Sequence, residues 1–340
     1  MKGAVYLGEC EIEVREFPKP EPGPGEVLVE MRSAGLCGSD LHKYHSDRVW
    51  AEERHGMIAG HEPAGIVAEL GTGATGLSVG DRVSVYHSLG CGHCAYCLSG
   101  EPVFCAEEGA FGRTRDGCHA DFMLAPARHC LPLPEDFSFD VGAALACTTC
   151  TAFAAVHKLR ARAAESVAVF GLGPVGLTTL LMAQVIGCRG IGVEVNAYRL
   201  DLARRLGCDV LVNAQDADAV ETIMDLTDGR GADGILECSG SAAARTQTAE
   251  AAAKRGHIVI VGAGAREVTV EERKILSKEL TIQGNAVFPM RAYFEAIEFL
   301  RSHPLPLDDM VTHRFAIEQA PEAFALFDTG NTGKVVFAWQ

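Results

Sequence analysis

Four cysteines lie close together in the chain at the spacing C-x2-C-x2-C-x7-C. They are Cys91, Cys94, Cys97 and Cys105. Four thiolates can complete a tetrahedral shell around Zn²⁺ and leave no open position, so such a site is structural. An iron–sulfur cluster accepts the same four ligands and is the alternative. The spacing therefore predicts a loop that binds a metal.

Two further clusters combine a thiol with imidazole and carboxylate side chains. The first runs from Cys37 to His42, and the second is the pair His61-Glu62. A catalytic zinc needs three protein ligands and one exchangeable position, and Cys147 would be the natural third ligand after Cys37 and His61. A lone cysteine is more often a small buried apolar side chain than a ligand, so spacing leaves this second site open.

A glycine-rich turn follows an apolar run in the middle of the chain. Its sequence, G-L-G-P-V-G at residues 171–176, fits the pattern G-x-G-x-x-G. The first glycine permits a tight bend, the second lets the backbone approach a pyrophosphate, and the third lets a helix pack closely on a strand. The helix that follows offers free N–H groups and its positive dipole end to the phosphates. We predict that a dinucleotide contacts Gly171, Gly173, Pro174, Val175 and Gly176.

An acidic residue in the next apolar run bears on the choice of cofactor. Glu194 lies near the end of this run, where a carboxylate can accept hydrogen bonds from the adenosine ribose and would repel a 2′-phosphate. This position favours NAD over NADP. Arg199 is close in sequence and keeps NADP open as the less favoured cofactor. We also assign Val261, at the end of a later apolar run, to cofactor binding.

The elements that must position these residues differ between two parts of the chain. Residues 1–150 are rich in glycine, proline and cysteine and contain short β-type runs. From residue 151 to residue 288, β-type runs alternate with helical patterns such as 197–206 and 242–253. This alternation predicts βαβ units and a doubly wound parallel sheet covered on both faces.

We therefore expect two domains in an α/β chain. The tail after residue 288 is too short for a core of its own, so it should rejoin the first part. The predicted division is a mostly-β, zinc-binding catalytic domain of residues 1–150 and 289–340, and a dinucleotide-binding domain of residues 151–288.

Composition and charge disfavour several classes of protein. The 340 residues are 48% hydrophobic and 22% charged, as in globular proteins, and the formal net charge of -15 disfavours a nucleic-acid partner. Residues 167–188 carry no charge and would be long enough to span a membrane. Three glycines and a proline interrupt the first half of this run, which indicates a strand, a turn and a helix instead. With no signal-peptide pattern at the N-terminus, we expect a cytoplasmic protein without a membrane partner.

Together these segments resemble the zinc-containing medium-chain alcohol dehydrogenase family over essentially the whole chain. Besides the four-cysteine loop and the glycine turn, the resemblance is carried by P-G-P-G-E-V-L-V at 22–29, C-G-S-D-L-H at 37–42, G-H-E-P-A-G at 60–65, V-G-D-R-V at 79–83 and G-K-V-V at 333–336. The resemblance implies a GroES-like catalytic domain and a Rossmann domain. It also implies a zinc-dependent oxidoreductase that transfers hydride between NAD and an alcohol, ketone or aldehyde.

The resemblance implies two zinc ions per chain. Cys37, His61 and Cys147 match the ligands of the catalytic zinc, and the four-cysteine loop matches the structural zinc. Alcohol dehydrogenases proper have a cysteine at the position of Cys147, whereas many polyol dehydrogenases use a glutamate nearby. Cys150 is the competing thiol, but the family pattern fits only the register that makes Cys147 the ligand.

The resemblance also assigns residues around the catalytic zinc. Glu62 matches a carboxylate that can approach the metal during ligand exchange, and Asp40 matches the carboxylate that orients the histidine ligand. Ser39 and His42 match a proton relay. Zinc lowers the pKa of a bound alcohol as it lowers that of water, and the released proton would pass through Ser39 to His42 and then to solvent.

Side chains near the substrate indicate its polarity. His87, four residues before the first cysteine of the loop, falls where family members place a pocket-lining side chain. An imidazole there favours a small polar substrate, namely a polyol, sugar or amino alcohol, over a simple primary or secondary alcohol. Trp50 and His55, between the two ligand clusters, are further candidates for the pocket.

Two alternatives have other chemistry. A zinc-free reductase of the same fold would have no use for either metal cluster. A non-catalytic module that binds zinc and a nucleotide would need no route for a proton, so Ser39 and His42 argue against it. Because the family is usually dimeric or tetrameric, we expect a homo-oligomer.

Overall fold

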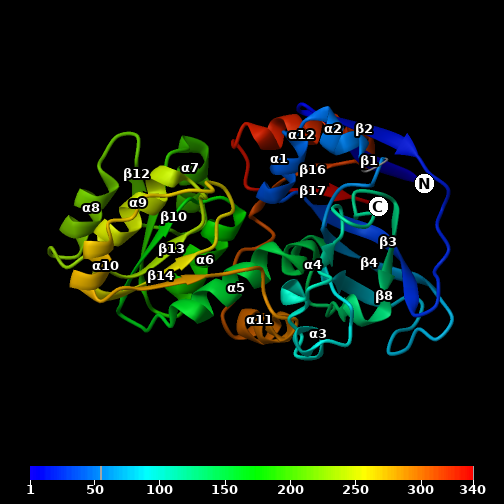
Figure 1. Cartoon of the computed structure of the whole chain (residues 1–340), viewed down its shortest axis with the longest axis horizontal. Helices are drawn as coiled ribbons and strands as arrows, with labels where there is room; N and C mark the ends of the chain where they lie inside the picture. The colour runs from blue at the N-terminus through cyan, green and yellow to red at the C-terminus, as the bar shows by residue number, and fades with distance from the viewer. Residues whose placement is uncertain (54–55, 340) are drawn as a thin grey trace. The chain divides into compact units, whose positions relative to one another are not determined.

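The computed structural model describes residues 1–53 and 56–339, so His55 lies outside the described residues. They form two compact units (Figure 1). The first unit contains Met1–Cys150, Pro289–Phe294 and Val311–Gln340, and the second contains Thr151–Phe288 and Glu295–Met310.

A six-stranded parallel sheet forms the centre of the second unit, in the order β12-β11-β10-β13-β14-β15. This is the 3-2-1-4-5-6 order of the doubly wound dinucleotide-binding fold, and it confirms the predicted parallel sheet. All five residues of β10 are buried, as expected for a central strand with both faces covered. In chain order the strands are β10 (Ser166–Phe170), β11 (Arg189–Glu194), β12 (Leu211–Asn213), β13 (Ala232–Glu237), β14 (Ala252–Ile260) and β15 (Thr281–Gly284).

Helices alternate with these strands. They are α6 (Pro174–Val185), α7 (Ala197–Arg205), α8 (Ala219–Leu226), α9 (Ala242–Ala251) and α10 (Glu272–Lys278), and α5 (Thr148–Leu159) precedes the first strand. The uncharged run 167–188 is indeed a strand, a turn and a helix. The helix predicted over 242–253 stops at Ala251, because Ala252 pairs with Ala232 as the first residue of β14.

A seven-stranded sheet, antiparallel except for one pair, forms the centre of the first unit. Its order is β16-β17-β3-β4-β5-β9, with β8 also paired to β3, and β16 and β17 run parallel. The bounds are β3 (Glu26–Gly35), β4 (Glu62–Leu70), β5 (Arg82–Val85), β8 (Phe122–Pro126), β9 (Cys130–Pro132), β16 (Val311–Phe315) and β17 (Lys334–Ala338). β17, from the end of the chain, pairs with β3, with Val336 opposite Gly35. This pairing brings the last strand beside the segment that precedes Cys37.

Two small two-stranded sheets and several short helices complete the first unit. One is the hairpin of β1 (Lys2–Gly8) with β2 (Glu11–Glu16), and the other pairs β6 (Ser88–Leu89) with β7 (Gly109–Ala110) across the four-cysteine loop. The α-helices are α1 (Gly38–Tyr44), α2 (Arg48–Glu52), α3 (Ala95–Leu98), α4 (Phe139–Ala146), α11 (Arg291–Ser302) and α12 (Ala320–Asp328); α11 continues past the bounds of this unit. The 3₁₀ turns are η1 (Pro102–Phe104), η2 (Ala127–His129) and η3 (Ile317–Gln319).

Apolar side chains of β3 and α12 form much of the core of the first unit. Val27, Val29 and Met31 alternate along β3 and are fully buried, together with Phe324 of α12 and Phe337 of β17. Among the described residues, no single helix is both long and apolar enough to cross a membrane. α4 and α5, which are bent relative to each other, are long and apolar enough when taken together, by length and composition alone.

Two glycines in the turn between β10 and α6 are required by the local geometry. Gly171 has φ +86°, a conformation that favours glycine. A Cβ on Gly176 would lie 1.8 Å from the carbonyl oxygen of Gly171, so α6 can approach the turn only without a side chain there. At Gly173, in contrast, the nearest atom to a Cβ would be Nη1 of Arg199, at 3.8 Å. Gly173 therefore leaves open space next to the turn.

We expect Gly176→Ala to lower the free energy of unfolding by about 3 kcal/mol, because the new methyl group would collide with backbone that cannot move aside. Gly173→Ala is the matched control and should cost about 1 kcal/mol or less, the usual difference between glycine and alanine at a helix N-cap. Urea unfolding of both variants measures the difference. Equal losses of stability would contradict this packing argument.

Candidate metal centre and dinucleotide site

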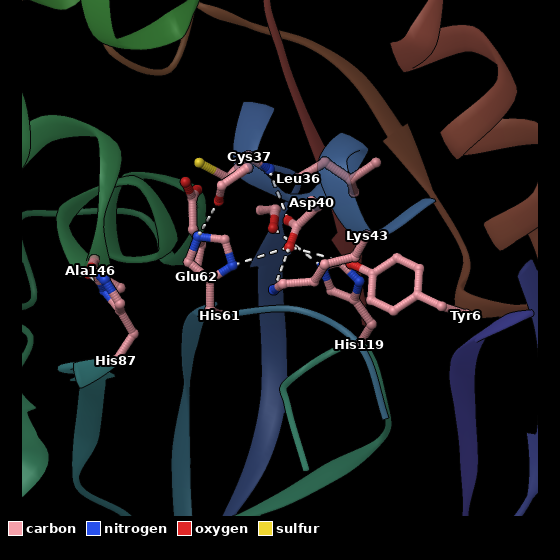
Figure 2. A network of polar contacts seen from close by, with 12 residues as sticks. Tyr6, Leu36, Cys37, Asp40, Lys43, His61, Glu62, His87, His119 and Ala146 are labelled. Carbon is pink, nitrogen blue, oxygen red and sulfur yellow. Dashed lines mark hydrogen bonds and ion pairs between the residues drawn. The ribbon is translucent and has the colours of Figure 1, made fainter. Parts of the chain in front are cut away.

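Asp40 is the central residue of a buried polar network at the start of α1. Its Oδ2 accepts a hydrogen bond of 3.0 Å from the backbone N–H of Cys37, the N-cap residue of the helix. Its Oδ1 lies 3.0 Å from Nδ1 of His61 and 3.2 Å from the hydroxyl of Tyr6 (Figure 2). Burial by itself would raise the pKa of Asp40, but the charges of His61 and Lys43 hold it well below its usual range. One carboxylate thus joins α1, β1 and the residue before β4.

The network directs the other ring nitrogen of His61 toward the thiols. With Nδ1 engaged by Asp40, Nε2 lies 3.4 Å from the hydroxyl of Ser39. One donor atom each from Cys37, His61, Glu62 and Cys147 lies within 4.8 Å of the others. The structure therefore brings the three predicted ligands together, with the Glu62 carboxylate beside them, although Cys147 is far from Cys37 in sequence.

The side chains of this cluster shift one another's pKa values. The hydrogen bond from Cys147 lowers the pKa of Cys37 well below its usual range against the effect of burial, and the nearby imidazole of His61 acts in the same direction. The pKa of Cys147 is raised well above its usual value by Cys37 and by burial. Burial lowers the pKa of His61, but Asp40 and Cys37 outweigh it and raise that pKa to about 10. The fit to an ion rests on the donor types: two sulfurs and an imidazole nitrogen that lie close together are the ligands that Zn²⁺ takes in proteins.

A buried lysine beside the cluster was not assigned a role from the sequence. The side chain of Lys334, which is 2% exposed, forms an ion pair with Glu62 and donates hydrogen bonds to the backbone oxygen of Leu36 (2.9 Å) and to Oγ1 of Thr148 (3.0 Å). Thr148 in turn donates to Oε1 of Glu62 at 2.9 Å. In the sequence, the only indication of a role for Lys334 is that a single lysine precedes the apolar run V-V-F-A. Its partner could not be identified from the sequence because it belongs to β4.

The predicted relay and pocket residues lie at different distances from the cluster. Ser39 and His42 are three residues apart on α1 and so share a face of it; Ser39 is half-buried beside His61, and His42 is exposed. The buried ring of His87 lies 5.3 Å from that of His61, and its Nδ1 is 2.9 Å from the backbone oxygen of Ala146. Trp50 packs edge-on against Tyr6, with ring centroids 6.3 Å apart. Trp50 therefore contacts the tyrosine that bonds Asp40.

The four-cysteine loop also brings its thiols together. One sulfur each from Cys91, Cys94, Cys97 and Cys105 lies within 4.8 Å of the others. The backbone N–H groups of His93 and Cys94 lower the pKa of Cys91 to about 6, which favours the thiolate that a metal requires. The backbone N–H of Cys91 in turn donates to the sulfur of Cys105 at 3.4 Å. A closed set of four thiolates fits a structural Zn²⁺.

In the second unit, Glu194 and Arg199 lie beside the glycine turn. Glu194 is 5% exposed, and its Oε2 accepts a hydrogen bond of 2.7 Å from the backbone N–H of Leu172. Nη1 of Arg199 is 3.9 Å from that oxygen. Among the described residues, Nε of Arg199 is a buried atom without a hydrogen-bond partner. An unpaired buried donor next to the open space at Gly173 fits an anionic dinucleotide.

Val261 follows β14 at the same edge of the parallel sheet. Its backbone N–H donates to the oxygen of Glu237 at 2.8 Å. Gly171, which follows β10, lies close to Ser239. A Cβ on that glycine would be only 2.6 Å from the Cβ of Ser239. The carboxyl ends of β10, β13 and β14 therefore meet where the doubly wound fold binds its ligands.

The fold, the two thiol clusters and the glycine turn are those of a zinc-binding dehydrogenase with a nucleotide-binding unit. Residues 23–135 match the model of the alcohol dehydrogenase GroES-like domain, and residues 174–302 match that of the zinc-binding dehydrogenase. The chain belongs to the zinc-containing medium-chain alcohol dehydrogenase family, and it is an oxidoreductase that requires zinc and a nicotinamide cofactor.

Individual relatives cover almost the whole chain. The uncharacterized zinc-type alcohol dehydrogenase-like protein YphC of Escherichia coli (strain K12) is 36% identical over 98% of this chain and 97% of its own length. An L-threonine 3-dehydrogenase of Pyrococcus horikoshii is 34% identical, over 96% of this chain and 94% of its own. Among solved structures, the alcohol dehydrogenase TADH from Thermus sp. ATN1 has a TM-score of 0.93, with 28% identity over 100% of both chains.

We expect Lys334→Met to lower the free energy of unfolding by about 3 to 5 kcal/mol, because it leaves the buried carboxylate of Glu62 without its cation. The double variant Lys334→Met with Glu62→Gln should regain part of that loss. Lys2→Met, which removes an exposed ion pair with Glu318, is the control and should change stability far less. Denaturant unfolding gives all three values. A single variant no less stable than the double variant would refute the role of the pair.

Proposed function

We propose that this protein oxidises the hydroxyl group of a small polar alcohol, a polyol, sugar or amino alcohol, and transfers the hydride to NAD. The observation that carries this proposal is the buried cluster of Cys37, His61 and Cys147, with Asp40 orienting the imidazole. In this proposal, residues 1–150 and 289–340 act as the catalytic domain, and residues 151–288 bind the dinucleotide.

We assign two zinc ions to each chain. Cys37, His61 and Cys147 would hold the catalytic ion, and the four-cysteine loop would hold the structural one. When bound at the catalytic site, zinc supplies a Lewis acid that lowers the pKa of an alcohol hydroxyl. The carboxylate of Glu62 lies within the same set of donor atoms, and Lys334 holds it in place.

The side chains of α1 provide the route for the proton in this proposal. Oγ of Ser39, 3.4 Å from Nε2 of His61, would accept the hydroxyl proton of the substrate. His42 is exposed on the same face of α1, so its imidazole can release a proton to solvent. General acid–base groups in such positions contribute about 10²–10⁴-fold to a rate.

The environment of His87 supports a polar substrate. Its Nδ1–H donates to the backbone oxygen of Ala146, which leaves Nε2 as the acceptor of the ring. Burial and the nearby charge of His61 lower the pKa of His87 to about 4, so the ring is neutral at physiological pH. A neutral, polar ring beside the metal ligands suits a substrate with a second hydroxyl or amino group. The relative that acts on L-threonine, a hydroxy amino acid, agrees with this class.

A simple primary or secondary alcohol is the second candidate substrate. The thiol of Cys147 favours it, because a cysteine at this position is typical of alcohol dehydrogenases proper. The structural similarity to the Thermus alcohol dehydrogenase supports the same reading.

The surroundings of Glu194 support NAD as the cofactor. Its two oxygens accept hydrogen bonds from the backbone N–H groups of Leu172 (2.7 Å), Val195 (2.7 Å) and Asn196 (3.0 Å), so the carboxylate is fixed beside the glycine turn. A fixed negative charge there would repel a 2′-phosphate. Arg199, 3.9 Å away, reduces that repulsion and makes NADP the second cofactor to test.

We also propose that the chain forms a homo-oligomer, a dimer or a tetramer. β15 is the last strand of the parallel sheet, all four of its residues are exposed, and Ile282 is 42% exposed. An unpaired strand edge with an apolar residue is a surface that a second copy can cover. Light scattering that gave the mass of one 36.2 kDa chain would refute this.

One assay series tests the proposed reaction. Zinc is quantified per chain, and reduction of NAD and of NADP is followed with alkanols, polyols, sugars and 3-hydroxy amino acids. In protein purified without added zinc, we expect two zinc ions per chain and the highest kcat/KM for NAD with a polar alcohol. Higher values with alkanols would select the second candidate, and higher values with NADP would overturn the cofactor assignment. Two zinc ions without turnover on any substrate would leave a non-catalytic binding module.

We expect Ser39→Ala to slow hydride transfer by about 10²-fold or more while the zinc content stays unchanged, because only the proton route is lost. Single-turnover kinetics and metal analysis of the same sample measure both. Ser46→Ala, which removes a hydroxyl that donates to the backbone oxygen of Lys43 just after α1, is the matched control. A rate equal to that of the control would remove Ser39 from the relay.

A further inference from the structure

Three side chains from distant parts of the sequence meet on the surface of the first unit, away from both zinc clusters. They are Cys10, His45 and Asp328, and all three are exposed. One donor atom of each lies within 4.8 Å of the others, and Nε2 of His45 is 2.8 Å from Oδ1 of Asp328. Figure 1 shows the elements that carry them, the β1–β2 hairpin, α1 and α12, at one end of this unit.

The backbone fixes the position of Cys10. Glu9 and Cys10 form the turn of the hairpin with φ values of 52° and 63°, a conformation that is uncommon for residues other than glycine. The N–H of Glu9 donates to the oxygen of Ser46 at 2.6 Å, and the N–H of Cys10 donates to that of Tyr44 at 2.9 Å. These two bonds hold the turn against both neighbours of His45 and place the thiol beside the imidazole.

The other two side chains are also held by ordered structure. His45 is the C-cap residue of α1, and its N–H donates to the oxygen of Leu41 at 2.8 Å. Asp328 is the last residue of α12. The two helices are joined by the rings of Tyr44 and Phe324, whose centroids are 5.4 Å apart. The cluster is therefore formed by the fold and needs no ion to assemble it.

The electrostatics at this point favour a cation. The C-terminal end of α12 carries the negative end of the helix dipole, and the carboxylate of Asp328 adds to it. Together with a thiolate from Cys10, the cluster offers two negative charges and one imidazole, which balance a divalent ion. Among the described residues, Asp328 forms an ion pair only with His45, which is charged only if protonated.

We propose that Cys10, His45 and Asp328 form a third metal site, specific for Zn²⁺ or a metal of similar softness. Sulfur, nitrogen and oxygen donors in one set match zinc, whereas Mg²⁺ and Ca²⁺ prefer oxygen donors alone. Three protein ligands leave a position for water, so the ion exchanges with solvent. On binding, the Cys10 thiol and any protonated imidazole release their protons to solvent, and no redox step is involved.

A bound ion at this site would link the first hairpin to the ends of α1 and α12. α1 also carries Ser39 and Asp40, so the third ion would brace the helix on which the proposed catalytic centre depends. The site itself does not depend on that function, because none of its three ligands belongs to either zinc cluster.

The test compares zinc binding by the wild-type holoenzyme and by surface variants. Each protein is kept reduced, equilibrated with micromolar free Zn²⁺ and analysed for zinc per chain. We expect the wild type to hold one equivalent more than Cys10→Ser and one more than His45→Gln. Glu322→Gln removes a carboxylate from the same helix without touching the cluster, and it should hold as much zinc as the wild type.

A second measurement keeps the test decisive if one variant folds poorly. The melting temperature of the wild type should rise with free zinc over the range in which the extra equivalent binds, and this rise should be absent in Asp328→Asn and His45→Gln. Equal zinc content in the wild type, Cys10→Ser and His45→Gln would overturn the proposal. So would an extra equivalent that all variants retain, since that marks non-specific binding. Neither result depends on turnover, so the proposed reaction stands or fails separately.

Discussion

The contact between the buried carboxylate of Asp40 and the imidazole of His61 is the interaction on which the metal centre depends. The same carboxylate accepts the backbone N–H of Cys37 at the start of α1, so one group sets both the helix N-terminus and the direction of the ring. Because Nδ1 is occupied in this way, only Nε2 can face the thiols. A rotation of the imidazole would remove one hydrogen bond from a fully buried carboxylate, which is costly.

A second group of buried, charged side chains lies next to this cluster. Glu62 follows His61 directly, and its carboxylate is held by Lys334 from the last strand and by Thr148 from the start of α5. Burial, with the negative charge of Cys37, raises the pKa of Glu62 to about 7 although Lys334 acts in the opposite direction. The antiparallel pairing of β17 with β3 is what allows Lys334 to reach this point. The end of the chain is thus part of the centre formed by its beginning.

The dinucleotide site of the second unit depends on backbone approach more than on charge. Gly171 and Gly176 are needed because the turn bends sharply and α6 packs directly on it, whereas Gly173 leaves the space that a ligand can use. Glu194 is fixed by the N–H of Leu172 inside that same turn. The residue that discriminates between cofactors in our proposal is therefore bonded to the same turn that we propose binds the phosphates.

The sequence by itself determined the parallel sheet, the glycine turn and the family, because these depend on local periodicity and on ligands close together in the chain. It also indicated both metal clusters, although spacing could not join Cys147 to Cys37 without the resemblance. Only the tertiary structure decided which other side chains contact the predicted ligands. In the sequence, Lys334 is one polar residue beside an apolar run, and its role follows only from the pairing of β17 with β3. Nothing in the neighbouring sequence of Tyr6, Cys10 or Asp328 indicates their contacts. Such contacts join residues tens to hundreds of positions apart, and strand pairing and helix packing set them.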